Sequence, residues 1–480
     1  MPSNQSAFDR ARTKVVATVG PACSRADQLA ALVEAGVDVF RLNMAHGTLG
    51  EHAELIETIR QLADELNRPV AILVDLAGPK IRLGELANGE IDCTDGAEFR
   101  FIRGDVAGGP NELVSTYEKL VDELEVGNRV MLADGTVSMV VEERGQDFAQ
   151  CRVVQPGVIR SRQGINLPGA KLSVPGMTKR DCQHAVWAAE SGVDFVSLSF
   201  VRSAGDVHAL KTMLRACGSQ AKVIAKIEKP EALDHLEEIL HAADGAMVAR
   251  GDLGVEIDIA RVPLAQKRII TMCNTLQKPV ITATQMLDSM QHSRYPTRAE
   301  ATDVANAILD GTDACMLSGE TAIGDYPCQA VAMMRRIALE AEALFRDRPA
   351  HLTPLDSPNL HRVTPAVLNG AGQMARQLGA KLMAVTSHSG ATVLAVSKQR
   401  NFAPTIGVSD SPSALRVMCL YWGVIPMASA PTHDVAELMR HVEQWGSANG
   451  TLASGDRIVI VTGSQLTRDG HNLLTVLEIE

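Results

Sequence analysis

Aromatic residues are scarce in this 480-residue sequence, and long apolar runs are missing. Phe, Trp and Tyr together make up 3% of the chain, whereas hydrophobic residues as a whole make up 46%. The core must therefore be built from Ala, Val, Leu and Ile, which suits helices packed on parallel strands. No run of 18 apolar residues occurs, so we expect no membrane span.

The sequence also has no basic tract and no clustered cysteines. Its net charge of −11 argues against a nucleic-acid partner, so an anionic ligand would need a local positive cluster or a metal ion. The nine cysteines are dispersed and form no Cys-x-x-Cys motif, as expected of reduced thiols. The polar segment 1–12 contains no apolar signal core. We therefore expect a cytoplasmic protein without a membrane or nucleic-acid partner.

Apolar strand patterns alternate with helical patterns over most of the first 345 residues. The expected strands are 14–19, 38–43, 70–75, 195–199, 222–226, 245–249, 279–283 and 313–317. The expected helices are 26–35, 51–67, 179–191, 204–217, 230–242, 261–277, 297–310 and 326–344. Eight such units predict a (β/α)8 barrel made of residues 1–82 and 175–345, with its active site at the carboxyl ends of the strands.

Residues 83–174 interrupt this rhythm. The segment is rich in Val, Thr, Gly and Asp, with alternation over 129–141 and a turn signal at Asp134-Gly135. We expect a small all-β domain. Because it is inserted after the third strand, it should stand over the barrel mouth as a lid that excludes water or carries a catalytic group. A passive insertion is the alternative.

Residues 346–480 form a third predicted domain, which begins with the proline-containing linker 346–358. Separate strand–helix units indicate a smaller open α/β sheet. Its first strand leads into Thr386–Thr392, where hydroxyl groups and a glycine precede a helix. Such a segment suits an anion, because backbone N–H groups are free at a helix start, but it is equally an N-cap cluster.

Charged residues follow the apolar strands of the predicted barrel. Lys226 and Glu228 are two residues apart and so point the same way, and Asp252 arrives from the next strand. Two carboxylates and an ammonium suit a divalent cation with an anionic substrate. A simple salt bridge is the alternative, but nearly every strand ends in such residues: Arg41, Asn43, His46, Asp75, Lys80, Arg82, Ser199, Arg202, Arg250, Thr282, Thr284, Gln285, Ser318 and Glu320.

Several uncommon strings occur in a fixed order along the chain. They are 41–47, 75–82, 166–169, 226–228, 249–254, 283–287, 296–307 and 317–321. With these strings in this order, the sequence resembles the pyruvate kinase family across nearly its whole length. The resemblance implies transfer of the phosphoryl group of phosphoenolpyruvate to ADP, a reaction that depends on charge neutralisation and alignment.

The resemblance also implies roles for residues at the predicted rim. Glu228 and Asp252 would hold Mg²⁺ or Mn²⁺, while Lys226 and Arg41 would neutralise the phosphoryl group. The substrate carboxylate would be bound by the N–H groups of Gly251 and Asp252 with Thr284. The nucleotide or its phosphate would be bound by Asn43, His46, Arg82 and Lys179. The enolate would be protonated through Thr284, Ser318 and Glu320.

Purely structural roles remain as alternatives for some of these side chains. The alternatives are that Ser318 and Glu320 only brace Lys226 and that His46 only caps a helix. Arg250 is expected to pair with Glu256 or Glu228.

The sequence departs from the commonest family pattern at the monovalent-cation site. Ala45, Leu76 and Lys80 stand where that pattern has Ser, Thr and Glu. A family branch with Leu and Lys at two of these positions is K⁺-independent, so we expect no K⁺ requirement here. The resemblance further implies a homotetramer and an effector whose phosphate is held by Thr386, Ser387, Ser389, Gly390 and Thr392.

Two other functions are compatible with parts of this pattern. A Mg²⁺-dependent lyase or aldolase also needs a Glu and an Asp on adjacent strands, but it has no need of a lid or a nucleotide. A phosphometabolite sensor needs no chemistry, and it gives no reason to keep Arg41, Lys226, Glu228 and Asp252 together. ATP formation from phosphoenolpyruvate separates the first alternative from a pyruvate kinase.

Overall fold

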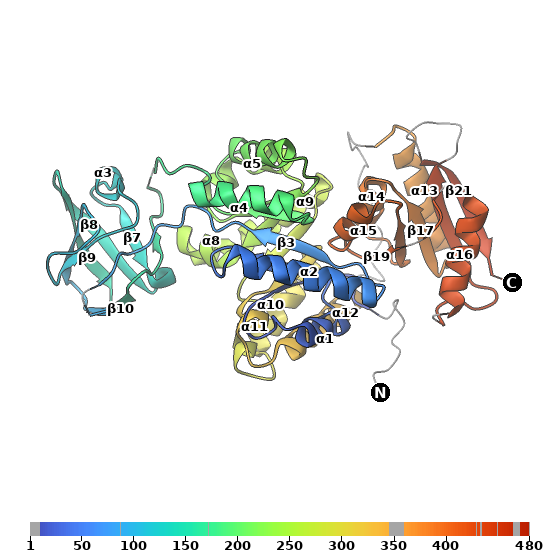
Figure 1. The fold of residues 1–480 in the computed structure, drawn as a ribbon, viewed down its shortest axis with the longest axis horizontal. Helices are drawn as coiled ribbons and strands as arrows, with labels where there is room; N and C mark the ends of the chain where they lie inside the picture. Colours follow the sequence, from blue (N-terminus) through green and yellow to red (C-terminus); the bar gives the residue numbers. More distant parts are fainter. Residues whose placement is uncertain are drawn as a thin grey trace.

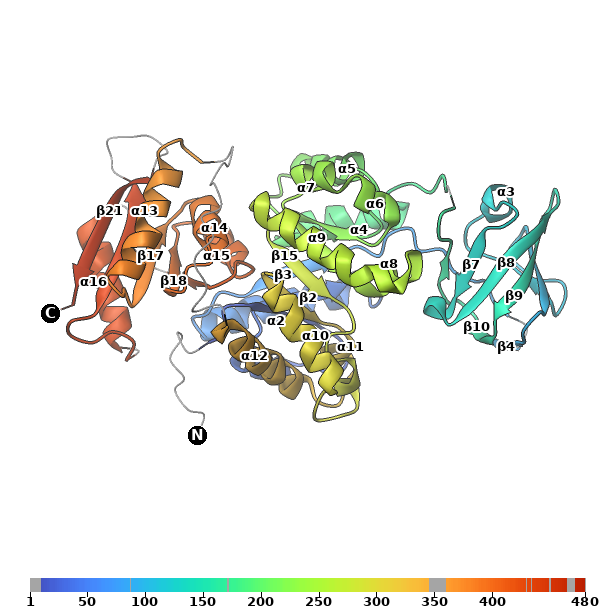
Figure 2. The ribbon, with the colours of Figure 1, turned by 180° about the vertical axis from the view of Figure 1, so that it is seen from behind.

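Three parts of the chain lie in a row in the computed structural model (Figure 1). It describes residues 10–86, 88–170, 172–344, 360–428, 430–432, 434–448, 450–463 and 471–479. The central part is a barrel, a β domain lies at one end and an α/β domain at the other (Figures 1 and 2). The predicted linker 346–358 lies outside the described residues. Within the described residues, no helix combines the length and apolar character needed to cross a bilayer.

The central part is a closed, all-parallel barrel with strand order β1-β16-β15-β14-β13-β12-β3-β2. Its strands are β1 (Lys14–Thr18), β2 (Val39–Asn43), β3 (Ala71–Asp75), β12 (Phe195–Leu198), β13 (Lys222–Ile227), β14 (Gly245–Ala249), β15 (Val280–Ala283) and β16 (Ala314–Leu317). The predicted (β/α)8 barrel is therefore confirmed, with each strand within one residue of its expected position at either end.

Helices cover the outside of the barrel. They are α1 (Ala26–Ala35), α2 (Leu49–Glu65), α4 (Lys179–Glu190), α5 (Ala204–Ala216), α6 (Pro230–Asp234), α7 (Leu236–Ala242), α9 (Val262–Thr275), α10 (Arg298–Leu309) and α12 (Pro327–Ala343). Reciprocal caps begin several of them: the hydroxyl of Thr178 accepts from the Asp181 N–H at 3.0 Å, and Thr297 does the same for Glu300 at 3.2 Å.

The prediction of a single helix over residues 230–242 is wrong. The chain leaves helical geometry at His235, where φ is −103° and ψ is 23°, and so α6 and α7 are separate. Three short helical segments at the carboxyl ends of the strands were also not predicted: α8 (Arg250–Glu256), η3 (Asp288–Gln291) and α11 (Gly319–Ala322). All are too short to show a helical period in the sequence.

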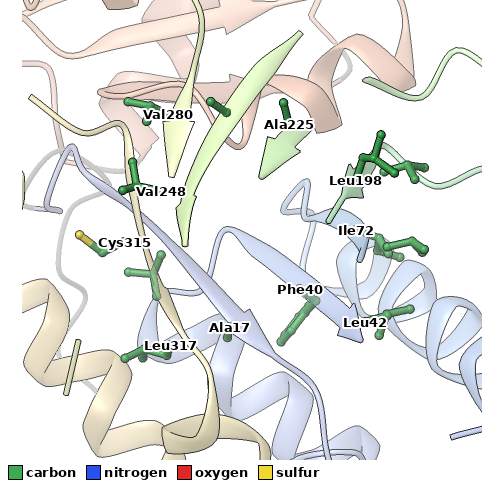
Figure 3. Packing of buried hydrophobic residues seen from close by; sticks show 14 of the residues in the cluster. Ala17, Phe40, Leu42, Ile72, Leu198, Ala225, Val248, Val280, Cys315 and Leu317 are labelled. Atoms are coloured by element: carbon green, nitrogen blue, oxygen red, sulfur yellow. The ribbon is translucent and has the colours of Figure 1, made fainter. Parts of the chain in front are cut away.

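Strand alternation separates two layers of side chains in the barrel. Odd and even positions of one strand face opposite sides. Phe40 and Leu42 belong to the cluster shared with the surrounding helices, together with Ile72 and Leu198 (Figure 3). Val39 instead packs with the inner residues of the other strands, which include Leu73, Phe195, Ile224 and Met247. Continuing the inner positions toward the carboxyl end reaches Arg41, Asp75 and Lys226, so the same alternation that builds the core aims these side chains at the barrel mouth.

The inserted segment forms the β domain that the sequence predicts. One sheet has the order β11-β7-β8-β9-β5-β6, and a second pairs β10 with β4. The elements are β4 (Glu90–Cys93), β5 (Glu98–Ile102), β6 (Glu112–Leu113), α3 (Leu120–Glu123), β7 (Arg129–Leu132), η1 (Ala133–Gly135), β8 (Val137–Arg144), β9 (Phe148–Gln155), β10 (Gly157–Arg160) and β11 (Ile165–Asn166). We call this part the lid. It has its own apolar core and touches the barrel near α8.

The third part is an α/β domain with sheet order β19-β18-β17-β20-β21. Its elements are α13 (Thr364–Gln377), β17 (Leu382–Thr386), α14 (Ala391–Lys398), β18 (Thr405–Val408), α15 (Pro412–Met418), β19 (Val424–Met427), α16 (Val435–Ala448), β20 (Arg457–Gly463) and β21 (His471–Glu478). The open α/β sheet was predicted, but β21 was not. This strand is antiparallel to β20 and forms one edge of the sheet.

Buried ion pairs fasten this domain to the barrel. Lys398 Nζ lies 2.6 Å from Asp313 Oδ2, and their side chains are 2% and 0% exposed. Arg400 reaches the other oxygen of Asp313 at 3.0 Å. Arg416 similarly contacts Asp194 at 2.6 Å. Because Asp313 also accepts from the Val280 N–H at 2.8 Å, it connects the interface directly to strand β15.

Replacing this acid should destabilise the attachment of the α/β domain. Asp313→Asn leaves the Lys398 ammonium buried without a counter-charge, and breaking a buried pair in this way costs about 3–5 kcal/mol. We expect a clearly lower melting temperature by differential scanning calorimetry. Asp325→Asn, at an exposed pair with His292, should melt like the parent protein. Equal melting of the two variants would contradict the assigned importance of this pair.

Candidate active site

Asp75 lies at the centre of a buried charge cluster in the barrel mouth. Its Oδ2 accepts from Arg41 Nε at 2.8 Å and lies 2.6 Å from Arg41 Nη2. Its Oδ1 accepts from Ser197 Oγ at 2.6 Å and lies 3.4 Å from Lys226 Nζ. Burial works to raise the pKa of Asp75, but Lys226 and Arg41 outweigh it, so the pKa lies below its ordinary value. Asp75 therefore stays ionised and orients both cations.

Lys226 is held by three neighbouring groups. Its Nζ donates to Ser199 Oγ at 2.6 Å and lies 2.9 Å from Glu228 Oε1, in addition to its contact with Asp75. Burial alone would lower the pKa of Lys226, but Asp75 and Glu228 raise it above the ordinary value. A charged ammonium is thus fixed inside the barrel mouth, where an anionic group of a substrate can approach it.

Glu228 and Asp252 are neighbouring carboxylates. Glu228 is fully buried, and its Oε2 accepts from the Phe200 N–H at 2.6 Å. Burial raises the pKa of Glu228, Lys226 opposes the rise, and the nearby Asp252 adds to it. Two adjacent carboxylates suit a hard divalent cation, which would relieve their repulsion. Among the described residues, no three His, Cys, Asp or Glu side chains come together as a metal-binding group.

Lys80 reaches across the rim toward the same acid. Its Nζ lies 3.2 Å from Asp252 Oδ1 and 3.9 Å from Asp134 Oδ1 in the lid. Of the two other residues that depart from the family pattern, Leu76 is fully buried and Ala45 partly exposed. Lys80 thus occupies the edge of the predicted metal site and bridges the barrel and the lid.

A strained turn positions Thr284 beside α8. Thr284 and Gln285 have positive φ angles of 67° and 54°, which are unfavourable for non-glycine residues. The Gly251 N–H donates to Thr284 Oγ1 at 2.7 Å, and Thr284 Oγ1 donates to the Ala283 carbonyl at 2.7 Å. The predicted carboxylate-binding groups of Gly251 and Thr284 are therefore adjacent, but in this structure they bind one another.

Arg250 fastens that turn. It donates from Nη2 to the Thr284 carbonyl at 2.8 Å, and its Nη1 lies 2.7 Å from Asp303 Oδ2. The expected pairing of Arg250 with Glu256 or Glu228 is therefore wrong. The acidic partner comes from helix α10, which sequence spacing did not reveal.

Ser318 and Glu320 lie at the start of α11. Glu320 is buried and accepts from the N–H groups of Leu287 and Ser318 at 3.0 and 2.7 Å. Burial raises the pKa of this carboxyl group. Ser318 Oγ is buried and has no hydrogen-bond partner among the described residues. The contacts do not support the alternative that these two residues brace Lys226, because the hydroxyl group that accepts a hydrogen bond from Lys226 is that of Ser199.

The four predicted nucleotide residues lie on different segments. Asn43 ends β2 and accepts from the Ala45 N–H at 3.2 Å, and the carbonyl of exposed His46 contacts His52 Nε2 at 2.9 Å. Arg82 donates to the Arg162 carbonyl at 3.1 Å, at the base of the lid. Lys179 is the exposed first residue of α4. The structure thus spreads them over both sides of the junction between lid and barrel.

The predicted effector residues surround the start of α14. Gly390 precedes the helix with a φ of 83°, and Ser389 Oγ accepts from the Ala391 N–H at 3.4 Å. Thr386 donates to Thr462 at 3.2 Å, and Thr392 Oγ1 lies 3.2 Å from His471 Nδ1 on β21. Ser387 is buried. These hydroxyl groups therefore gather beside one helix N-terminus, away from the barrel rim.

Other residues of the site were not predicted, or were misplaced. Ser197 orients Asp75, and strand parity with Ser199 would have revealed it. Phe200 supplies its N–H to Glu228 with a φ of 56°, which no sequence pattern indicates. Thr282 was expected at the rim. Its hydroxyl instead donates to Thr312, which lies just before β16 at the end of the barrel opposite the rim.

Comparison with known proteins agrees with this geometry. The sequence model of the pyruvate kinase barrel domain matches residues 10–331, and that of the pyruvate kinase alpha/beta domain matches residues 365–477. The chain belongs to the pyruvate kinase family. The predicted family and enzyme class, a phosphotransferase of glycolysis, are thereby confirmed.

Individual pyruvate kinases resemble the chain over nearly its full length. The enzyme of Geobacillus stearothermophilus is 40% identical over 469 residues, which are 97% of this chain and 80% of the relative. That of Bacillus licheniformis is 38% identical, with the same coverage. A crystal structure of a pyruvate kinase from Cryptosporidium parvum has a TM-score of 0.92 at 34% identity and covers 98% of this chain and 97% of its own. Pyruvate kinases generally use Mg²⁺ and K⁺ and act on phosphoenolpyruvate and ADP.

Proposed function

We propose that this pyruvate kinase transfers the phosphoryl group of phosphoenolpyruvate to ADP at the barrel mouth. The observation that carries the proposal is the buried cluster of Arg41 and Lys226 around Asp75, next to Glu228 and Asp252. Two oriented cations beside two carboxylates suit a phosphate ester that loses its phosphoryl group. Such a transfer needs charge neutralisation and alignment more than covalent catalysis.

Each residue of the cluster has a defined task. Lys226 and Arg41 bind the phosphoryl group from two sides, and Lys226 also stabilises the enolate that remains. Glu228 and Asp252 would hold Mg²⁺ or Mn²⁺, which supplies charge neutralisation to substrate oxygens when bound. The N–H groups of Gly251 and Asp252 bind the substrate carboxylate with Thr284, once the Gly251–Thr284 hydrogen bond gives way to the ligand.

Protonation of the enolate is assigned to Thr284 and to the groups at the start of α11. Thr284, Ser318 and Glu320 form the proposed relay, and Glu320 suits proton storage because burial raises its pKa. Asn43, His46, Arg82 and Lys179 bind the nucleotide where lid and barrel meet. This position fits an acceptor that arrives over the phosphoryl group and is enclosed as the lid moves.

The proposed limits of the three parts are 1–82 with 175–345 for the barrel, 83–174 for the lid and 346–480 for the regulatory domain. Separate sheets in the three parts, and a separate apolar core in the lid, support this division. We further propose a homotetramer, as expected from the family, in the cytoplasm. The nine cysteines are all free, which fits a reducing compartment.

A first prediction concerns the metal site. Glu228→Gln keeps the shape of the side chain but removes one of two carboxylates, so turnover should fall by orders of magnitude and Mn²⁺ binding should weaken. Steady-state rates against Mg²⁺ and Mn²⁺ binding by electron paramagnetic resonance measure both. Glu238→Gln, on an exposed side chain of α7, serves as the control. Near-parental activity of Glu228→Gln at low Mg²⁺ would refute the assignment.

A second prediction concerns K⁺, which we propose is not required. Lys80 supplies a fixed positive charge at the rim, and Ala45 has no hydroxyl group to offer a cation. Two unit charges about 4 Å apart repel by about 4 kcal/mol at an effective dielectric constant near 20, so K⁺ and Lys80 should exclude one another. We expect equal rates with Mg²⁺ in K⁺ and in tetramethylammonium buffers. Strong stimulation by K⁺ would disprove this.

The reverse substitution tests the same idea from the other side. Lys80→Glu should slow the enzyme and make its remaining activity respond to K⁺. The response should be clearest when Ala45→Ser and Leu76→Thr are added.

A third prediction concerns regulation. We propose that the hydroxyl groups of Thr386, Ser387, Ser389 and Thr392, with the Gly390 turn, bind the phosphate of an effector such as a sugar phosphate or nucleoside monophosphate. Thr392→Glu places a negative charge there and should abolish activation without lowering the basal rate. An effector that couples by roughly 1–3 kcal/mol changes the apparent substrate affinity 5–150-fold. Thr392→Ser is the matched control, and activation that survives Thr392→Glu would argue against the site.

A further inference from the structure

Helix α8 is the part of the barrel on which the lid rests. In both views it lies at the end of the barrel nearest the lid (Figures 1 and 2). A Cβ placed on Gly135 of η1 would lie 3.6 Å from the Val255 side chain. Lys80 connects Asp252 to Asp134, and Asn166 of β11 contacts Glu256. The lid is therefore in contact with the same short helix that carries Asp252.

Glu256 is the buried member of these contacts. Its side chain is 1% exposed, and its Oε1 accepts from Asn166 Nδ2 at 2.9 Å. The same oxygen accepts from Lys229 Nζ at 2.7 Å. One carboxylate oxygen thus joins the returning strand of the lid to the residue that directly follows Glu228. Asn166 is itself buried, so this hydrogen bond forms away from solvent.

We propose that Glu256 is a positioning residue that couples the position of the lid to the two carboxylates Glu228 and Asp252. Asp252 and Glu256 are four residues apart on α8 and therefore lie on one face of the helix. Lys229 transmits the same contact to Glu228 through the backbone. This inference rests on the proposed role of Glu228 and Asp252 as metal ligands and assigns a residue that the transfer mechanism does not itself use.

The composition of this contact suits a joint that opens. When the lid moves away, Glu256 loses the amide of Asn166 but keeps the ammonium of Lys229. The buried charge therefore stays paired in both positions, and opening does not leave an uncompensated carboxylate. If the lid were held only by an ion pair, each opening would leave one charge without its partner.

The test is a double-mutant cycle of Glu256→Gln and Asn166→Ala, measured without substrates. Mn²⁺ affinity by electron paramagnetic resonance reports on Glu228 and Asp252, and amide hydrogen exchange of residues 157–170 reports on the lid. We expect each single variant to weaken Mn²⁺ binding several-fold and to speed exchange in the lid. We expect the double variant to be no worse than the weaker-binding single variant, because both changes break one contact. In the assay, KM for ADP should rise more than kcat falls.

Controls separate this coupling from loss of stability and from failure of the metal site. Glu342→Gln removes an equally buried carboxylate that binds Thr13 at the far end of the barrel. It should lower the melting temperature without changing Mn²⁺ affinity. Asn166→Ser is the milder variant if Asn166→Ala does not fold. Unchanged Mn²⁺ affinity in Glu256→Gln, or additive effects in the cycle, would overturn the inference. If Glu228→Gln also leaves Mn²⁺ affinity unchanged, the proposed metal site itself is wrong.

Discussion

The pairing of Asp75 with Arg41 and Lys226 is the interaction on which the barrel mouth depends. Two cations cannot be buried side by side without an acid between them, because the cost of removing them from water is several kcal/mol for each ion. Asp75 accepts a hydrogen bond from Arg41 and forms an ion pair with Lys226, and Ser197 completes its hydrogen bonding. The side chain is made available by strand alternation alone: Leu73 packs inside the barrel, and Asp75 is the next inward position. The apolar core and the charged rim are therefore consequences of one period.

Short, irregular segments complete what the strands begin. The turn at Thr284 and Gln285 has unfavourable backbone angles, and it is held by Arg250, which is in turn held by Asp303. Strain of this kind persists only where the surroundings over-determine it. Here it turns the Thr284 hydroxyl toward Gly251 at the start of α8. The groups of Gly251 and Thr284 at the rim are thus brought together by this turn and not by the regular strands.

The regular part of this architecture could be predicted from the sequence, and the irregular part could not. Barrel strands were visible because each is a short apolar run bounded by polar residues, and Lys226 and Glu228 could be assigned one face by counting. The positive φ of Phe200 and the seven-residue helix α8 could not be predicted, because neither leaves a periodic signal in the sequence. The partner of Arg250 was missed because Asp303 is remote in sequence. Strand β21 was missed because its residues alternate weakly and pair only at a sheet edge.

Buried acids occupy comparable positions at the two ends of the barrel. At one end, Asp313 holds Lys398 and Arg400 of the α/β domain and also the backbone of β15. At the other, Glu256 holds the lid through a neutral amide and keeps Lys229 as its own counter-charge. The difference in partner chemistry separates the two junctions. Separating the first junction would break the ion pairs of Asp313 with Lys398 and Arg400. The lid is joined to the barrel here by one neutral hydrogen bond and by the more exposed contact of Lys80 with Asp134, whereas the α/β domain is joined by ion pairs to an acid that also binds the backbone of β15.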